Sequence, residues 1–358
     1  MEKKVVVGMS GGVDSSVAAY LLKIQGYDVI GVTMQIWQDE EEFVRAENGG
    51  CCGLSAVEDA RRVASVLQIP YYVMNFKKEF KSCVMDYFVD EYLHGRTPNP
   101  CIACNRYVKW EALLQRSLEI GADYIATGHY AKVEEHPSGR LAVKSSVTDH
   151  KDQTYALYNL TQEQLSHTLM PIGAYTKEEV RRIAAKAGLP VAGKPDSQDI
   201  CFVPDGDYAS FLEQAAPERI PAEGNFVDTK GNILGRHKGI THYTIGQRKG
   251  LGLAMGHPVF VAGIRPETNE VVIGEDEDIR TKVVYCDNVN YMAISDLEKP
   301  RRASVKIRYA HQGSPCLLEK TEDGRVKMTF DEPVRAATPG QAAVFYEDGW
   351  VLGGGTIV

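Results

Sequence analysis

The chain has 358 residues, of which 44% are hydrophobic and 25% are charged, a balance typical of ordinary folded proteins. This composition excludes a disordered or collagen-like chain, and the length predicts two or three domains. No apolar run approaches the roughly 18 residues that a membrane span requires, so we expect no membrane partner and a cytoplasmic location.

The net charge of −8 excludes a protein that is basic over its whole surface. The charge is uneven, however, because residues 229–266 contain no Asp or Glu but six Lys or Arg. Such a run is either a solvated face or a local basic surface for an anionic partner.

Strand and helix patterns alternate over the first 205 residues. Short apolar runs predict strands at 4–8, 28–34, 71–74 and 124–127. Helical periodicity predicts helices at 17–25, 58–67, 77–93, 109–120 and 177–187. This alternation predicts an α/β domain with a parallel sheet that helices cover on both faces.

The pattern changes near residue 206. Short β-type runs appear at 258–264, 270–273, 282–285, 303–309, 326–330 and 342–346, with turn signals between them. We therefore expect three domains: 1–205, a small β-rich middle domain at 206–280, and a C-terminal β-barrel at 281–358.

The strongest local signal lies between the first predicted strand and helix. Residues 8–16 read Gly-Met-Ser-Gly-Gly-Val-Asp-Ser-Ser. Glycines let the backbone approach an anion, and amides at a helix start point toward it. The loop is no Walker A motif, because it lacks the lysine. Asp14 is a candidate for Mg²⁺ placement or for helix capping. The loop resembles the SGGxDS motif of PP-loop ATP pyrophosphatases, which implies ATP binding.

Further motifs narrow the resemblance. They are Gly-Arg-Thr-Pro-Asn-Pro-Cys-Ile-Ala-Cys-Asn at 95–105, Ala-Thr-Gly-His-Tyr at 126–130, Lys-Asp-Gln-Thr-Tyr at 151–155, Asp-Ser-Gln-Asp-Ile-Cys-Phe at 196–202, Gly-Gln-Arg-Lys-Gly-Leu-Gly at 246–252 and Thr-Pro-Gly-Gln at 338–341. In this order, from residue 5 to the C-terminus, they resemble the tRNA-specific 2-thiouridylase family.

This resemblance implies an enzyme, a tRNA-uridine 2-sulfurtransferase that modifies the wobble uridine U34. ATP with Mg²⁺ adenylates the C2 oxygen, and a cysteine persulfide then supplies the sulfur. The family pattern makes Cys104 the nucleophile and Cys201 the persulfide carrier, and the two form a transient disulfide. The partners implied are tRNA and a sulfur-donor or sulfur-relay protein.

The resemblance also assigns binding residues. The implied ATP contacts are Gly8, Met9, Ser10, Gly11, Gly12, Val13, Asp14, Ser15, Met34 and Gly128. Asn99, Pro100 and Cys101 match the target-base position. The implied tRNA contacts are His129, Lys151, Asp152, Gln153, Arg308, Tyr309 and Gln341.

Cys101 departs from the pattern, because some family members carry Asp there. It is a spectator, a backup thiol or a substitute base contact. Cys101 and Cys104 also have the spacing of half a zinc site, which Cys51 and Cys52 would complete, and an iron–sulfur cluster is a further alternative. We expect no bound metal cluster, since a second CxxC is absent.

Two other functions remain open. A PP-loop synthetase that acts on a small molecule would need neither RNA nor Cys201. An RNA-binding module that uses the loop only as a turn would bind RNA without releasing AMP or pyrophosphate.

Overall fold

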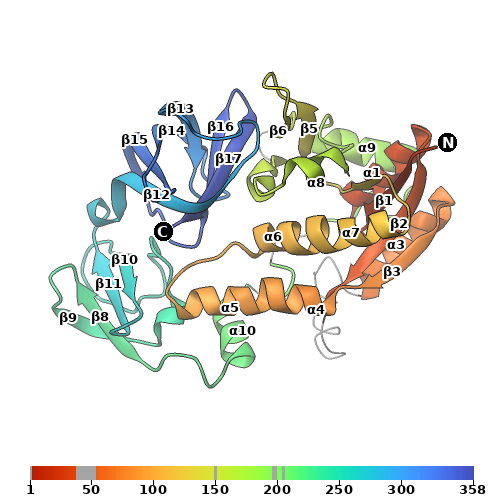
Figure 1. The fold of residues 1–358 in the computed structure, drawn as a ribbon. Coiled ribbons are helices and arrows are strands. Elements are labelled where there is room, and N and C mark those ends of the chain that lie inside the picture. Colours follow the sequence, from red (N-terminus) through yellow and green to blue (C-terminus); the bar gives the residue numbers. More distant parts are fainter. Residues whose placement is uncertain (1, 38–53, 149–150, 196–199, 204–205) are drawn as a thin grey trace.

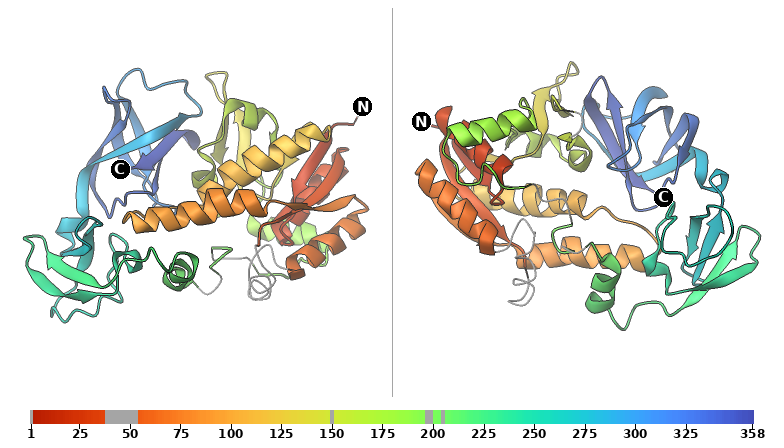
Figure 2. Two further views of the ribbon diagram at one scale, coloured as in Figure 1. Left: turned by 60° about the horizontal axis from the view of Figure 1, so that its bottom comes forward. Right: turned by 180° about the vertical axis from the view of Figure 1, so that it is seen from behind.

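A computed structural model of the chain describes residues 2–37, 54–148, 151–195, 200–203 and 206–358. An α/β region lies at one end, a small sheet and a β-barrel lie at the other, and two long helical segments run between them (Figures 1 and 2). Within the described residues, no helix has the length and apolar character needed to cross a membrane.

The N-terminal region contains the predicted parallel sheet, with strand order β3-β2-β1-β4-β7. The strands are β1 (Lys4–Gly8), β2 (Asp28–Gln35), β3 (Tyr71–Asn75), β4 (Tyr124–Ala126) and β7 (Thr168–Leu169). Strand β1 is central, and Val5, Val6 and Val7 are fully buried. Successive side chains of a strand point to opposite faces, and Val5 and Val7 accordingly join one core cluster while Val6 joins another.

Helices cover both faces, as predicted. Helices α1 (Val13–Ile24), α3 (Leu54–Leu67) and α9 (Lys177–Lys186) contribute to the cluster that contains Val5 and Val7. On the other face lie two composite helices. The first joins α4 (Lys77–Phe80), a π-helical segment (Lys81–Met85) and α5 (Asp86–Leu93), and the second joins α6 (Pro100–Ala103), a π-helical segment (Cys104–Leu113) and α7 (Leu114–Glu119).

The second composite helix begins earlier than the sequence pattern predicts. We expected a start at residue 109, but the helix begins at Pro100. The Asn99 side chain accepts hydrogen bonds from the amides of Cys101 and Ile102, and proline is well tolerated at a first helical position. Cys104 therefore lies inside a helix rather than on a connecting loop.

The middle region forms a four-stranded sheet in the order β10-β11-β8-β9. Its strands are β8 (Gly224–Asp228), β9 (Ile233–His237), β10 (Phe260–Arg265) and β11 (Glu270–Gly274), and Phe226, Tyr243 and Val261 pack in its core. The last two strands were predicted. Strands β8 and β9 were missed, because glycine and charged residues interrupt their apolar pattern.

Six C-terminal strands close into the predicted barrel through the pairing of β12 with β17. They are β12 (Arg280–Tyr291), β13 (Arg301–Lys306), β14 (Ser314–Lys320), β15 (Val326–Arg335), β16 (Ala342–Glu347) and β17 (Trp350–Ile357). Strands β14 and β17 were not predicted. Strand β17 is rich in glycine, and close packing requires this at Gly354, where a Cβ would lie 2.6 Å from the Ala343 carbonyl oxygen.

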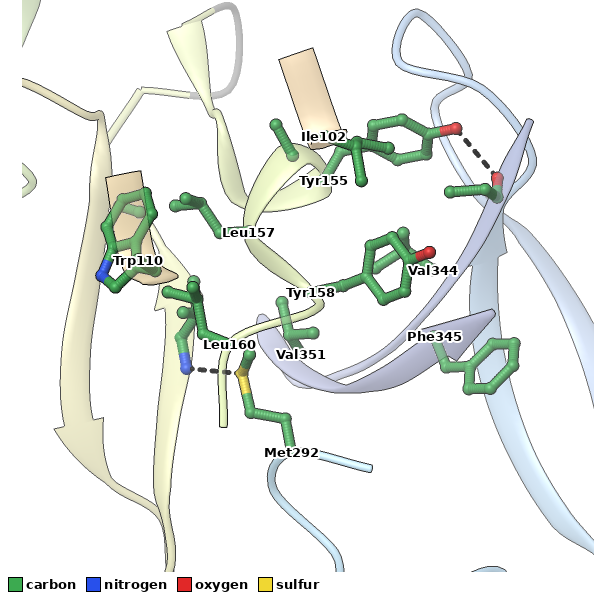
Figure 3. Packing of buried hydrophobic residues seen from close by; sticks show 14 of the residues in the cluster. Ile102, Trp110, Tyr155, Leu157, Tyr158, Leu160, Met292, Val344, Phe345 and Val351 are labelled. Carbon is green, nitrogen blue, oxygen red and sulfur yellow. Dashed lines mark hydrogen bonds between the residues drawn. The ribbon is translucent and has the colours of Figure 1, made fainter. Parts of the chain in front are cut away.

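A hairpin from the first half of the chain extends the barrel sheet. Strands β5 (Ala131–Glu135) and β6 (Leu141–Ser145) pair with each other, and Lys144 of β6 pairs with Trp350 of β17. The two regions also share a core, in which the Tyr155 hydroxyl donates to the Ala342 carbonyl at 2.9 Å (Figure 3). The N-terminal region is therefore fixed to the barrel.

The remaining elements are short. They are α8 (Gln162–Ser166), α10 (Tyr208–Ala215) and the 3-10 segments Thr154–Leu157, Ile240–His242 and Glu277–Ile279.

Candidate active site

The glycine- and serine-rich loop connects β1 to α1, as predicted. Helix α1 begins after Gly12, which provides no side-chain cap. The Ser15 hydroxyl accepts from the Ser10 amide at 3.2 Å, and the Ser16 hydroxyl donates to the Gly12 carbonyl at 2.7 Å. The first turn of α1 thus presents backbone amides without a carboxylate cap, an arrangement that suits a phosphate ligand.

Two glycines allow close backbone approaches at this loop. Gly11 has a φ of +69°, and a Cβ there would lie 2.3 Å from the Ala56 carbonyl oxygen. A Cβ on Gly128, just beyond β4, would lie 2.5 Å from the Ser15 amide nitrogen. Neither distance is sterically possible without backbone movement, so both positions require glycine.

Asp14 does not cap the helix. Its carboxylate accepts from both the Lys177 ammonium, at 2.8 and 2.9 Å, and the Tyr130 hydroxyl, at 2.7 Å. Lys177 begins α9 and its side chain is only 10% exposed. The sequence motifs included Tyr130, but Lys177 was missed because a lysine at a helix start is ordinary.

Met34 lies near the carboxyl end of β2, adjacent to the loop. Its side chain is half-buried and packs on the cluster that contains Val6. The neighbouring Thr33 hydroxyl donates to the Met9 carbonyl at 2.7 Å and fixes the start of the loop. Met34 and Gly128 therefore lie at the same edge of the sheet as the loop, where ligands of open α/β sheets bind.

The two cysteines with predicted catalytic roles pack on the same core cluster from different segments. Cys104 is half-buried at the start of the π-helical segment. Cys201 is half-buried as well, and its neighbour Phe202 packs edge-on against Phe80 and Phe88 of the first composite helix. The two residues, 97 positions apart in sequence (201 − 104), therefore both border the large core that extends from the sheet to the barrel, and their chemical roles stay predictions.

The target-base segment combines structural and exposed residues. Asn99 caps the helix with its side-chain oxygen, Pro100 is buried and Cys101 is exposed. The pKa of Tyr309 is raised, chiefly by burial, then by the charge of Asp152, with a smaller contribution from Cys101. The barrel residue Tyr309 thus lies against the loop that carries Asp152.

The 151–153 loop contacts both regions. The Asp152 carboxylate accepts from the Ser146 amide at 3.0 Å, while its backbone carbonyl accepts from the Tyr309 hydroxyl at 3.3 Å. The Gln153 side-chain oxygen accepts from the Tyr130 amide at 2.9 Å. Lys151 is partly exposed beside these residues.

Two other predicted tRNA contacts already have internal partners. The Arg308 guanidinium donates to the Arg335 carbonyl at 2.8 Å. His129 is buried against Trp110, and its Nδ1 lies 2.7 Å from the Thr127 hydroxyl. Burial, and then the charge of Lys109, hold the pKa of His129 well below its usual value, so the ring is neutral.

The segment before Cys104 is a junction of three regions, which the sequence patterns did not reveal. The Thr97 hydroxyl lies 3.3 Å from that of Thr244 in the middle region. The Thr97 amide donates to the Pro339 carbonyl at 2.9 Å, and the Gln341 side chain donates to the Thr97 carbonyl at 2.9 Å. Long-range contacts of this kind leave no local pattern that identifies them.

Among the residues that the structure describes, no group of three or more His, Cys, Asp or Glu side chains is arranged to hold a metal ion. Cys51 and Cys52, which the zinc alternative requires, lie outside the described residues.

The parallel sheet, the loop at its edge and the strand-end glycine have the arrangement of an α/β domain of the PP-loop class. Family models agree with this class and extend it. The model described as tRNA methyl transferase HUP domain matches residues 3–205, the tRNA methyl transferase PRC-barrel domain matches 209–275, and the aminomethyltransferase beta-barrel domain matches 281–357.

Curated relatives give the family. The tRNA-specific 2-thiouridylase MnmA of Lachnoclostridium phytofermentans is 68% identical over 99% of both chains. The proteins of the same name from Clostridium perfringens and Clostridioides difficile are 59% and 58% identical, over 99% and 100% of this chain and 98% of each relative. The chain therefore belongs to the tRNA-specific 2-thiouridylase family.

Solved structures are more distant. The U34-tRNA thiolase NcsA from Methanococcus maripaludis is 19% identical, with a TM-score of 0.35, and covers 61% of this chain and 67% of its own. A 4-thiouridine synthetase in complex with RNA and ATP is also 19% identical, with a TM-score of 0.34, over 61% of this chain and 51% of its own. Similarities at this level add nothing to the family assignment.

Proposed function

We propose that this chain converts the wobble uridine U34 of tRNA to 2-thiouridine, with ATP as the activating substrate and a persulfide on Cys201 as the sulfur source. Membership of the family makes it a tRNA sulfurtransferase. The observation that carries the detailed proposal is the contact between the barrel and the catalytic domain. The Tyr309 hydroxyl donates to the Asp152 carbonyl, and the Gln341 side chain donates to the carbonyl of Thr97, in the segment before Cys104. A substrate held by the barrel would reach the segment that carries Cys104.

The loop at residues 8–16 would bind the pyrophosphate of ATP, and Met34 and Gly128 would lie near the adenosine. Adenylation is needed because the C2 oxygen of uridine is a poor leaving group, and AMP is a good one. Asp14 fits a Mg²⁺ site poorly, since both carboxylate oxygens accept from Lys177. We infer that Mg²⁺ arrives with ATP, where it neutralises phosphate charge, and we assign no metal-holding role to the protein.

The sulfur step balances with two cysteines. The terminal sulfur of the Cys201 persulfide attacks C2, and the C2 oxygen leaves with AMP. The Cys104 thiolate then attacks Sγ of Cys201, the sulfur–sulfur bond of the persulfide breaks, and the terminal sulfur stays on the base. The product is a Cys104–Cys201 disulfide, which an external thiol reductant returns to two thiols. A donor or relay protein would reload Cys201 with sulfur.

The rest of the chain would hold tRNA. In this proposal residues 1–205 perform the chemistry, 206–280 and 281–358 bind the RNA, and Lys151, Tyr309 and Arg308 line the approach to the base. An anticodon base must leave its stack to be modified, at a cost of a few kcal/mol. Distributed phosphate contacts would offset that cost and would make binding weaker at high salt.

The test is a thiolation assay on unmodified tRNA with ATP, Mg²⁺ and a persulfide-generating donor. The RNA is digested, and 2-thiouridine is detected by mass. Cys104→Ser and Cys201→Ser are each expected to reduce product at least about 1000-fold, as removal of a covalent catalytic group does. Cys83→Ser is the matched control, since Cys83 is also half-buried and lies on the neighbouring composite helix.

Other outcomes separate the alternatives. Product that survives Cys201→Ser would remove the persulfide assignment and keep the family. Pyrophosphate release without tRNA would favour a synthetase, and RNA binding without AMP release would favour a binding module. Iron, zinc and sulfide analysis of the purified chain tests whether Cys104 and Cys201 act as thiols, since a stoichiometric metal lost in both variants would contradict the disulfide step.

A further inference from the structure

The pyrophosphate loop contains no basic residue of its own, and two lysines from later in the chain reach it. Lys177 is buried and is committed to the carboxylate of Asp14. The Lys194 ammonium donates to the backbone carbonyl of Gly11 at 3.1 Å and to the Asp59 carboxylate at 2.8 Å. Lys194 thus contacts the backbone of the loop itself, at Gly11.

The backbone of Lys194 is fixed as well. The Arg181 guanidinium of α9 donates to the carbonyls of Ala192 and Lys194, at 3.2 and 3.0 Å. Asp59 belongs to α3, whose Ala56 carbonyl packs directly on Gly11. The lysine therefore projects from a tethered segment and ties the loop between two helices.

The bond to Gly11 has a geometric consequence. In a trans peptide the carbonyl and the following amide point in opposite directions. Gly11 has a φ of +69°, and glycine crosses between backbone conformations at little cost, so the Gly11–Gly12 peptide needs an external restraint to keep one orientation. By holding the carbonyl, Lys194 fixes the direction of the Gly12 amide at the start of α1.

We propose that Lys194 is a positioning residue for ATP, because it holds the Gly11–Gly12 peptide in the orientation that binds the pyrophosphate. This inference needs one part of the proposed function, namely that the loop binds the pyrophosphate of ATP. Lys194 acts through the backbone, and its loss would weaken ligands that occupy the loop while sparing those that do not.

The test compares MgATP with AMP in calorimetric titrations of the full chain, because AMP lacks the two phosphates that the loop would bind. Lys194→Met is expected to weaken MgATP at least about tenfold, in the range expected for the loss of one hydrogen bond to a charged ligand. The same variant should change AMP affinity less than about twofold. Lys194→Arg, which can still donate to Gly11, should stay within about threefold of the parent for both ligands.

Asp59→Asn is the matched control. It removes the ion pair but leaves Lys194 free to donate to Gly11, and it should cost less than about threefold. Equal losses in Asp59→Asn and Lys194→Met would overturn the proposal and assign Lys194 to the ion pair alone. Equal weakening of AMP and MgATP by Lys194→Met would overturn it as well, because that pattern indicates a general defect of the fold.

A salt series and the affinities of the parent chain distinguish the remaining explanations. The titrations are repeated at about 50 and about 500 mM KCl, because salt screens a direct charge attraction but not a backbone orientation. A Lys194→Met effect that vanishes at high salt would overturn the positioning role in favour of direct phosphate contact. A parent chain that binds MgATP no better than AMP would overturn both this inference and the assignment of the pyrophosphate loop.

Discussion

The two ends of the candidate site are built in different ways. At the proposed ATP-binding end (the nucleotide end), one contiguous loop makes hydrogen bonds within itself, such as the one from the Ser16 hydroxyl to the Gly12 carbonyl, and Lys177 and Lys194 support it. At the proposed tRNA-binding end (the tRNA end), Thr97 is hydrogen-bonded to the middle region through Thr244 and to the barrel through Gln341. The first end is thus built around one loop within the α/β region, whereas the second depends on how three regions dock. Substitutions should therefore separate ATP binding from thiolation.

After the two cysteine substitutions, Gly128→Ala should have the largest effect, and the effect should fall on the nucleotide end. Its Cβ would lie 2.5 Å from the Ser15 amide nitrogen, so the start of α1 must move. We expect kcat/KM for ATP in thiolation to fall at least about 100-fold, since misplaced catalytic groups cost that much. Binding of tRNA should be unchanged in a filter-binding titration.

Gly263→Ala is the control for this substitution, because a Cβ at Gly263 would make only ordinary contacts, at 3.7 Å from Val272. An unchanged ATP dependence in Gly128→Ala would contradict the close packing of β4 on the loop.

Lys177→Met tests the support beneath the loop. It leaves the Asp14 carboxylate without its ammonium partner, and Asp14 is 31% exposed. Breaking a fully buried pair costs about 3–5 kcal/mol, so we expect a loss of about 2 kcal/mol in the free energy of unfolding after allowing for solvent screening. Urea unfolding measures this loss.

A second substitution shows whether the pair itself is responsible. The double variant Lys177→Met with Asp14→Asn should recover part of the loss, since no uncompensated charge then remains. A double variant that loses the sum of both single effects would show that the two side chains do not interact.

The lowered pKa of His129 predicts a pH dependence of stability that does not involve the loop at residues 8–16. Because burial lowers its pKa in the folded state, the unfolded chain binds more protons at this residue. Stability is therefore fully present above the unfolded pKa of about 6.5 and falls as pH decreases below it, by up to about 1.4 kcal/mol per pH unit. Unfolding measured between about pH 5 and 8 should show a shallower slope for His129→Gln.

Burial also lowers the pKa values of the buried His237 and the half-buried His311. Both residues remain in that variant, so part of the slope should persist. An identical slope in parent and variant would mean that the pKa of His129 is not lowered in the folded chain.

The contrast between the two ends also explains what could be predicted from the sequence. The parallel sheet, its helices and the loop were predicted, because periodicity and glycine placement act within a few residues. The predicted start of the second composite helix was wrong by nine residues (109 − 100). Asn99 caps the helix and Pro100 occupies its first position, so the helix begins within the proline-rich segment. Local signals thus identified the loop at the nucleotide end, but not the lysines that support it.

Nonlocal features were missed. The hairpin of β5 and β6 pairs with β17 across more than 200 residues (350 − 144 = 206), and no short pattern reveals such a pairing. The contacts of Lys177 and Lys194 with the loop depend in the same way on how α9 packs on α1. The roles of Cys104 and Cys201 rest on the family resemblance, and the assays above test them.

Gln341→Ala should have the smallest effect and should affect only the tRNA end. It removes the bond from the Gln341 side chain to the Thr97 carbonyl, which is worth about 1 kcal/mol. We expect thiolation to fall about three- to tenfold at saturating tRNA, with ATP affinity unchanged, because the segment before Cys104 loses one tie to the barrel. Gln115→Ala, which removes an exposed hydrogen bond to Glu119, is the control.

The family resemblance instead makes Gln341 a direct tRNA contact. If Gln341 acted only as such a contact, Gln341→Ala would raise the Kd for tRNA and leave the rate at saturating tRNA intact. Measuring both constants in one variant therefore decides whether Gln341 acts on the RNA or through Thr97.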